Sequence, residues 1–202
     1  MMLTSWGYTI TGSGTLSDLI TVAEFDAATA SRYANDTRVA PAISAASQAV
    51  RNYCGWHLAG SLPCKIEWPA NSRGIIRTGA DLLIQLPARF VTGITSVIID
   101  GTETTDYHLD NNGHLIVYDV AYLSRKDIVE VNYTAGLADA SAIKNLVVGL
   151  VTHAVARSYG VTSEAAGGVS ITYNSGWTNG SFDTIIQNNA GVLVPYRLEG
   201  VF

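Results

Sequence analysis

Charged side chains are scarce in this sequence. Asp, Glu, Lys and Arg make up 14% of the 202 residues, against about 25% in typical globular proteins. Apolar residues reach 48%, so the chain can bury a core and does not have the composition of a disordered protein. Because the centres of protein interfaces are depleted in charge, this composition favours a protein that assembles with partners.

An excess of basic residues is also missing. The 12 Lys and Arg face 17 Asp and Glu, for a net charge of −5. This balance argues against a sequence-reading nucleic-acid binder, which needs a basic surface. The longest apolar run, Leu146–Ala156, is interrupted by polar residues and glycine and falls short of the roughly 20 residues that cross a membrane. The first eight residues lack a basic and then apolar pattern, so no signal peptide and no membrane association are expected.

Cysteine is nearly absent. Cys54 and Cys64 are the two cysteines, too few for a disulfide framework, and a reducing compartment is the expected site of synthesis. A disulfide between these two residues is one interpretation. We favour the simpler one, in which Cys54 is a small buried apolar residue.

Catalytic motifs are missing as well. The sequence has no nucleophile elbow, zinc-protease motif, phosphate loop or dinucleotide fingerprint, so we expect no catalytic residue, cofactor or metal. His108 and His114 flank a turn and could face each other, but a solvated pair is favoured over a metal site. The aspartates of the same region are expected to form turns, because no calcium loop is present; they are Asp100, Asp106, Asp110 and Asp119.

Three helices are predicted from start signals and periodicity. Thr21 and Glu24 form a capping-box pattern, and the helix that they start should end near residues 33–36. A second helix should follow Thr37, with an apolar stripe at 39, 43, 46, 50 and 53, and end at Gly55. The third should cover 139–159, because apolar residues there keep a 3, 4 spacing.

The central segment changes to short β-rich stretches. Turn signals at Asp100-Gly101 and at residues 111–113 indicate two consecutive hairpins. We expect an antiparallel module of about five or six strands. The predicted fold is α+β: a three-helix core (21–56 and 138–160), an inserted antiparallel β module (57–137), a flexible N-terminal arm (1–20) and an extended C-terminal arm (161–202).

Tryptophans and the chain end are candidate contact residues. Trp56 and Trp68 are expected to wedge the helices and the β module together. Trp6 and Trp177 lie in Gly-rich segments without a local core, so an intersubunit pocket is predicted for them. Residues 192–202 are apolar and contain Pro195, which favours an extended segment that adds to a partner's sheet. The alternative is that this segment folds back on the chain's own helices.

Several stretches together resemble a known family. The run Ala45–His57, which ends in Tyr-Cys-Gly-Trp-His, is similar to a helix end common in head–tail connector (adaptor or head-completion) proteins of long-tailed bacteriophages and prophages. The order of Leu86-Pro87, Val97–Gly101, Val129–Gly136 and Pro195-Tyr196-Arg197 also resembles that family. The resemblance covers most of the chain from Thr21 onward.

The resemblance implies a structural subunit of the virion neck, made in the bacterial cytoplasm, and not an enzyme. Such adaptors form a ring, of about twelve copies, between the portal protein and a stopper or tail completion protein. The ring continues the channel through which double-stranded DNA passes without sequence-specific binding, and a net negative chain suits this role. The resemblance suggests the portal's rim as the partner of the C-terminal arm, through Leu193, Val194, Pro195, Tyr196, Arg197 and Leu198.

The β-rich centre and the tyrosine content leave an alternative. They also fit a carbohydrate-binding or adhesion module of a phage tail or cell surface. Aromatic side chains clustered on one strand face would favour that function.

Overall fold

The chain divides into two compact units. The computed structural model describes residues 2–3, 7–12, 16–110, 113–120, 123–156, 163–166, 169–172 and 182–198. One unit, here called the β unit, comprises Met1–Ser17, Gly55–Ala140 and Tyr196–Phe202; the other, the helical unit, comprises Asp18–Cys54 and Ser141–Pro195. Helices and antiparallel sheets are both present, as the α+β prediction requires.

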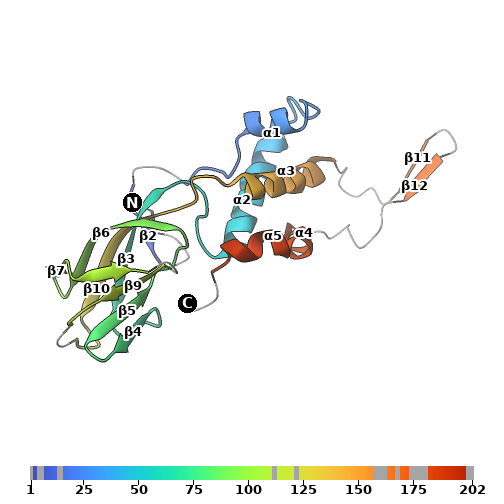
Figure 1. Ribbon diagram of the computed structural model, residues 1–202. Coiled ribbons are helices and arrows are strands. Elements are labelled where there is room, and N and C mark those ends of the chain that lie inside the picture. The colour runs from blue at the N-terminus through green and yellow to red at the C-terminus, as the bar shows by residue number, and fades with distance from the viewer. Residues whose placement is uncertain are drawn as a thin grey trace. The chain divides into compact units, whose positions relative to one another are not determined.

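The helical unit contains five helices in its described part (Figure 1). They are α1 (Val22–Ala28), α2 (Val39–Cys54), α3 (Ser141–Ala156), α4 (Phe182–Asn188) and α5 (Ala190–Leu193). Helix α2 contacts α1, α3 and α4, and α5 contacts α3 and α4. A hairpin of β11 (Ser163–Ala166) and β12 (Val169–Thr172) lies between α3 and α4 in sequence. None of the described helices is both long and apolar enough to span a lipid bilayer.

Helix α1 begins as predicted but ends early. The capping box is confirmed: the Glu24 amide donates to Thr21 Oγ1 at 3.1 Å, and the Thr21 amide donates to Glu24 Oε2 at 2.7 Å. Lys144 on α3 donates to the same carboxylate and, together with Thr21, lowers the pKa of Glu24 to about 2. The helix stops at Ala28 because Ala30 and Ser31 adopt left-handed φ values of 49° and 57°, which a right-handed helix excludes.

The core of the helical unit is formed by the apolar stripes of α2 and α3. The predicted α2 stripe is buried at 39, 43, 46 and 50. On α3 the buried residues are Ile143, Val147, Leu150, Val151 and Val155. Both helices therefore form where the 3, 4 spacing predicted them.

The prediction of three helices and an extended C-terminal arm is wrong for residues 182–196. This stretch forms α4, α5 and a 3₁₀ turn, η2 (Val194–Tyr196). Ile186 and Leu193 are 1% and 0% exposed, so burial against the other helices stabilises these short elements. The abundance of Gly and Asn around them concealed an i, i+3, i+4 spacing at residues 182, 185 and 186.

The β unit holds two antiparallel sheets. One has the order β1-β2-β3-β10-β6-β7 and the other β4-β5-β9-β8. The strands of the first are β1 (Met2–Leu3), β2 (Thr9–Ile10), β3 (Leu62–Pro69), β10 (Ile128–Ala135), β6 (Val91–Ile99) and β7 (Thr102–Thr104). Those of the second are β4 (Ile75–Thr78), β5 (Asp81–Gln85), β9 (His114–Val117) and β8 (Tyr107–Leu109).

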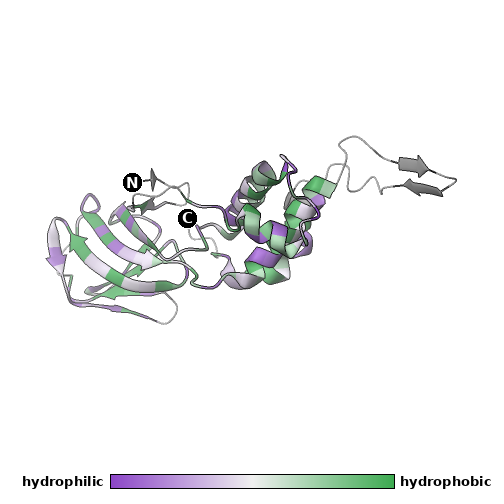
Figure 2. Cartoon of the chain, turned by 90° about the horizontal axis from the view of Figure 1, so that it is seen from above, coloured by the Kyte–Doolittle hydropathy of each residue, from purple (hydrophilic) through white to green (hydrophobic). Residues whose placement is uncertain are grey.

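The count of five or six strands for residues 57–137 was too low, because β4 and β7 are only four and three residues long. Both predicted hairpins are confirmed. The β6–β7 turn places Asp100 and Gly101 at φ values of 48° and 78°, which a type I′ turn needs. The β8–β9 hairpin pairs Leu109 with Leu115. Figure 2 shows hydrophobic and hydrophilic residues alternating along the longer strands, and β10 buries every second residue.

A buried histidine joins three separate segments of the β unit. The Tyr8 hydroxyl accepts from the His57 backbone amide at 3.0 Å and lies 2.7 Å from Nδ1 of the same residue. Because a carbonyl oxygen only accepts, Nε2 carries the proton that bonds the Ala135 carbonyl at 2.9 Å. His57 is 0% exposed.

The N-terminal segment is thus not a flexible arm where it is described. Tyr8 and Ile10 are 1% and 2% exposed, and β2 pairs with β3. Leu19 and Ile20 are also buried, and the Leu19 amide donates to the Ser47 hydroxyl on α2. The Gly and Ser turn signals predicted mobility, but the apolar residues between them find burial and hydrogen bonds.

Beside His57, the first and last residues of the inserted β segment are hydrogen-bonded to each other. The Leu137 amide donates to the Leu58 carbonyl at 2.8 Å, and the Gly60 amide to the Leu137 carbonyl at 3.3 Å. Gly136 has φ 138°, and a Cβ there would overlap the Gly60 carbonyl oxygen. This crossing therefore requires glycine at position 136.

We expect Gly136→Ala to destabilise the protein by about 3 kcal/mol or more, because backbone atoms cannot give way as a side chain would. The melting temperature should fall by roughly 6 to 12 °C in a thermal scan. Gly149→Ala on α3 is the matched control: nothing lies within 4 Å of the added Cβ, so it should leave stability unchanged or raise it. Equal melting temperatures for the two variants would contradict this account of the crossing.

Two tyrosines of the β unit offer a second paired test. Tyr8→Phe leaves the buried His57 amide and Nδ1 without their partner and should cost about 1–3 kcal/mol. Among the described residues, Tyr133 Oη is buried without a hydrogen-bond partner, so Tyr133→Phe should change stability by less than about 0.5 kcal/mol. Urea unfolding measures both. The reverse ranking would show that Tyr8 does not hold the N-terminal strand.

Candidate interaction surfaces

The described residues contain no cluster suited to catalysis or metal binding. No group of three or more His, Cys, Asp or Glu side chains could hold a metal among them. Cys54 and Cys64 are buried and form no disulfide, and burial raises the pKa of the Cys64 thiol to about 12. A buried thiol that stays protonated is a packing residue and not a nucleophile.

The histidine and aspartate candidates lie in hairpins and turns. His108 pairs in register with Ile116, and His114 Nδ1 lies 3.1 Å from Asp110 Oδ2. Asp100 and Asp119 adopt left-handed φ values of 48° and 50°. Their positions fit the expected turn-forming role.

The exposed face of the six-stranded sheet is polar. Lys65 lies 2.8 Å from Glu130 and 3.3 Å from Glu67. Asn132 donates to Ser96 Oγ at 2.9 Å and to Glu130 Oε1 at 3.0 Å. The hydrogen bond from Lys65 lowers the pKa of Glu130. These partners satisfy one another and suit contact with water.

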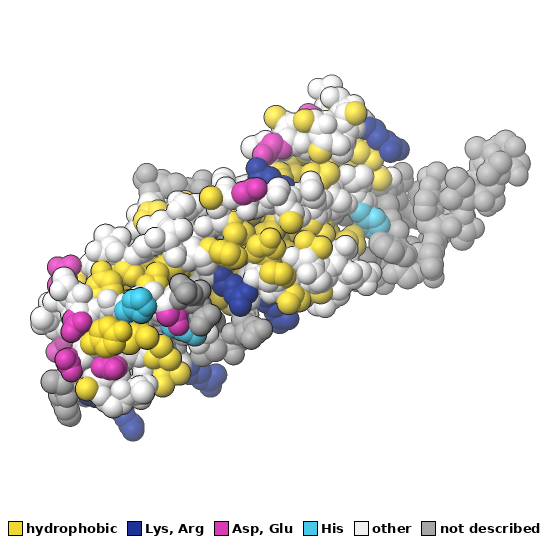
Figure 3. Space-filling model, in the orientation of Figure 1, with side chains coloured by type: hydrophobic (Ala, Val, Ile, Leu, Met, Phe, Trp, Pro, Cys, Tyr) yellow, Lys and Arg dark blue, Asp and Glu magenta, His cyan; other side chains and the backbone are white. Residues whose placement is uncertain are grey.

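On the exposed face of the four-stranded sheet an apolar row crosses three strands and ends at His108 on β8, and Asp81, Gln85 and His114 lie on the same face. Ile76 pairs in register with Leu83, and Leu83 with Ile116, so the three side chains form one row across β4, β5 and β9. Ile76 is 49% exposed, and the other two are half-buried. Figure 3 shows apolar side chains gathered on the β unit beside histidine and acidic side chains. We call this row the apolar sheet face.

Sequence reasoning missed the apolar sheet face, although a signal was present. Leu82-Leu83-Ile84 and Leu115-Ile116-Val117 are uninterrupted apolar runs. A strand with one face in solvent alternates, whereas a continuous run indicates that both faces are covered. In the described residues this face leaves Ile76 exposed and Leu83 and Ile116 half-buried.

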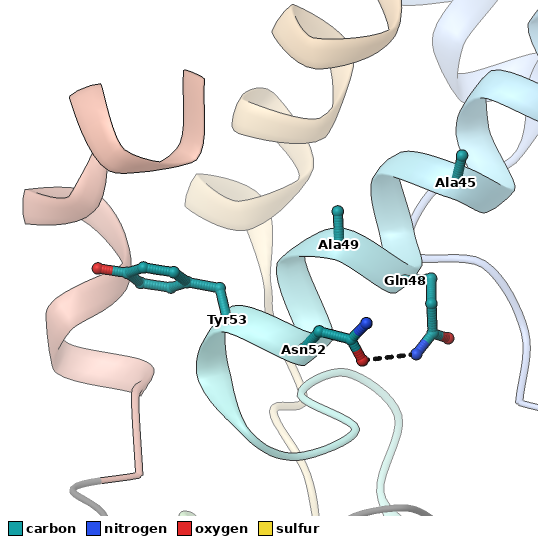
Figure 4. A pocket seen from close by; sticks show the side chains of 5 residues that line it. All are labelled: Ala45, Gln48, Ala49, Asn52 and Tyr53. Atoms are coloured by element: carbon teal, nitrogen blue, oxygen red, sulfur yellow. Dashed lines mark hydrogen bonds between the residues drawn. The ribbon is translucent and has the colours of Figure 1, made fainter. Parts of the chain in front are cut away.

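A shallow depression on α2 is a weaker candidate. Its volume is about 490 Å³, and it is lined by Ala45, Gln48, Ala49, Asn52 and Tyr53 (Figure 4). The Gln48 amide donates to Asn52 Oδ1 at 2.8 Å, so the two polar groups satisfy each other. All five residues come from one helix, and the surface carries no charge. It offers no chemistry for a specific ligand.

The six predicted portal-binding residues differ in environment. Leu193 is 0% exposed within α5, whereas Val194 is 56% exposed. Pro195 and Arg197 are exposed, and Tyr196 and Leu198 are half-buried. Trp56 Nε1 donates to the Tyr196 carbonyl at 2.6 Å. The segment therefore packs on its own chain at three positions and is exposed at three.

The four tryptophans were predicted to lie in an intersubunit pocket (Trp6 and Trp177) or between the helices and the β module (Trp56 and Trp68). Trp6 and Trp177 lie outside the described residues. Trp56 is 0% exposed and belongs to the β unit. Trp68 donates from Nε1 to the Gly7 carbonyl at 2.9 Å, also within the β unit.

The candidate sites in the described part of the chain are surfaces that a partner protein could contact, and the buried His57 is hydrogen-bonded within the fold. Such features are typical of proteins that assemble with partners. The model of the head completion protein family matches residues 18–197, and the chain belongs to that family. No curated protein matches the chain.

Family membership confirms the resemblance read from the sequence. Head completion proteins are structural components of the phage virion and not an enzyme family, and the chain has a head–tail connector role in assembly with other phage head and tail proteins. The adhesion alternative has no comparable support.

Proposed function

We propose that the protein is the subunit of an adaptor ring between the portal and the stopper or tail completion protein. The observation that carries this proposal is the pair of unlike faces on the β unit. One sheet exposes a hydrogen-bonded polar face, and the other exposes the row Ile76, Leu83 and Ile116.

The apolar sheet face is the proposed contact between neighbouring copies. Protein interfaces centre on apolar residues depleted in charge. Contacts between two different patches, repeated with a rotation that closes, produce a ring. Covering Ile76 in each copy removes apolar surface from water at about 25 cal/mol per Å².

The polar face is the proposed boundary of the DNA channel. Glu67 and Glu130 pair in register, and Glu103 lies on the same row beyond Ile98. Lys65 is the cation that contacts the first two. Acidic side chains repel phosphates, so DNA can pass without sticking to the wall.

The C-terminal segment is the proposed portal contact, through its exposed residues. Val194, Pro195 and Arg197 are exposed, so the segment offers both an apolar side chain and a cation. Leu193 is part of the helical core and is left out of this contact.

Ile76→Asp tests the contact between copies. The side chain is 49% exposed, so the free subunit should keep its stability within about 0.5 kcal/mol. A charge at the interface centre should weaken ring formation on the portal by at least about tenfold, as read by native mass spectrometry. Ile128→Asp is the control, since Ile128 is 39% exposed outside the row. Full ring formation by Ile76→Asp, or equal loss in both variants, contradicts the proposal.

Val194→Asp tests the portal contact. We expect roughly tenfold weaker binding of the ring to the portal, because a charge replaces an apolar contact residue. Val22→Asp on α1 is the matched control, with 44% exposure against 56% for Val194. Surface plasmon resonance on immobilised portal measures both. Undiminished binding by Val194→Asp would rule out this segment as the portal contact.

A further inference from the structure

The end of the described chain occupies a small aromatic site on the β unit. Trp56 donates its indole N–H to the Tyr196 carbonyl at 2.6 Å. The Phe90 ring stacks on Trp56 with a 6.1 Å centroid distance and lies 6.1 Å from the Tyr196 ring. Leu198 Cβ lies 3.7 Å from the position of a Cβ on Gly55. We call Gly55, Trp56 and Phe90 the tail slot, and residues 196–198 the tail.

The tail slot is built rigidly. Phe90 has φ +55°, which costs energy in a bulky residue and persists only where neighbours fix it. Its carbonyl accepts from the Gly136 amide at 3.2 Å. Trp56 is 0% exposed and packs edge-on against His57 at 5.3 Å. The slot therefore belongs to the same junction that holds the inserted segment together.

Three contacts of the tail lie at the slot. They are the hydrogen bond from Trp56 to the Tyr196 carbonyl, the Tyr196 ring beside Phe90, and the Leu198 side chain beside Gly55. Phe90 remains 47% exposed beside them. The tail follows Pro195, where the chain passes from the helical unit into the β unit.

We infer that the tail slot also receives the tail of a second copy of this chain. Identical copies carry identical tails, so exchange replaces every contact by the same contact. In a closed ring the neighbouring tail is present at high effective concentration. Tyr196 and Leu198 face the slot, and Arg197 is exposed between them, so exchange leaves the proposed portal contact in place. The inference rests on the proposed ring, which would bring a neighbouring tail close to the slot. The disulfide-trapping test below uses the chain without the portal.

Disulfide trapping tests the exchange in the full chain. The 3.7 Å separation matches the Cβ–Cβ distance of about 3.8 Å in disulfides. A chain carrying Gly55→Cys is mixed with one carrying Leu198→Cys under mild oxidation. We expect a mixed disulfide dimer between positions 55 and 198, identified by peptide mass spectrometry, whose yield rises with concentration. The double variant should form the same link within one chain.

Trp56→Phe in the Gly55→Cys chain should lower the mixed-dimer yield about fivefold, because the indole hydrogen bond is lost. Trp68→Phe is the matched control, since its indole also donates to a backbone carbonyl of the β unit, at 2.9 Å, away from the slot. Absence of the mixed dimer, while the double variant links within one chain, overturns the exchange. Absence of both links, or equal effects of the two tryptophan changes, overturns the slot.

A second measurement of the exchange avoids substituting Gly55, whose φ of +80° favours glycine. ¹⁵N-labelled unmodified chain is mixed with unlabelled chain carrying a spin label at Leu198→Cys. Broadening of the Gly55 and Phe90 amides, relative to a diamagnetic label, is expected; no broadening contradicts exchange. Native mass spectrometry on the portal separates the two hypotheses: a ring without exchange refutes only this inference, and exchange without a ring refutes only the proposed function.

Discussion

The His57 junction is the constraint on which the β unit depends. One buried imidazole bonds Tyr8 through Nδ1 and the Ala135 carbonyl through Nε2. It thereby joins the N-terminal segment to both ends of the inserted segment, and Gly136 crosses the Gly60 carbonyl beside it. Because buried polar groups without partners are costly, the three segments hold together or separate together.

This junction explains how a large β segment fits between two helices. Residues 58–60 and 137 are hydrogen-bonded to each other, so the segment begins and ends at one place. Strand β10 ends at this junction, so the junction fixes one end of the central pairing partner of β3 and β6.

The parts of the fold that depend on local periodicity could be predicted from sequence. The stripe of α2, the capping box of α1 and the turn at Asp100-Gly101 are local signals, and each is present in the structure. Tyr8 could not be placed, because its partner His57 is 49 residues away. Helices α4 and α5 were missed because Gly and Asn dominate their surroundings, and packing decides their conformation. The apolar sheet face depends on strand register, which no local pattern specifies.

Hydrogen exchange of the subunit, free and assembled on the portal, tests the central claim that the four-stranded sheet is an assembly surface. The account predicts slower exchange across residues 75–85 and 107–117 on assembly, because their exposed face becomes covered and their edges leave water. Residues 128–135, paired on both sides in the free subunit, should remain unchanged. Unaltered exchange across 75–85 and 107–117 in an assembled complex would contradict the account.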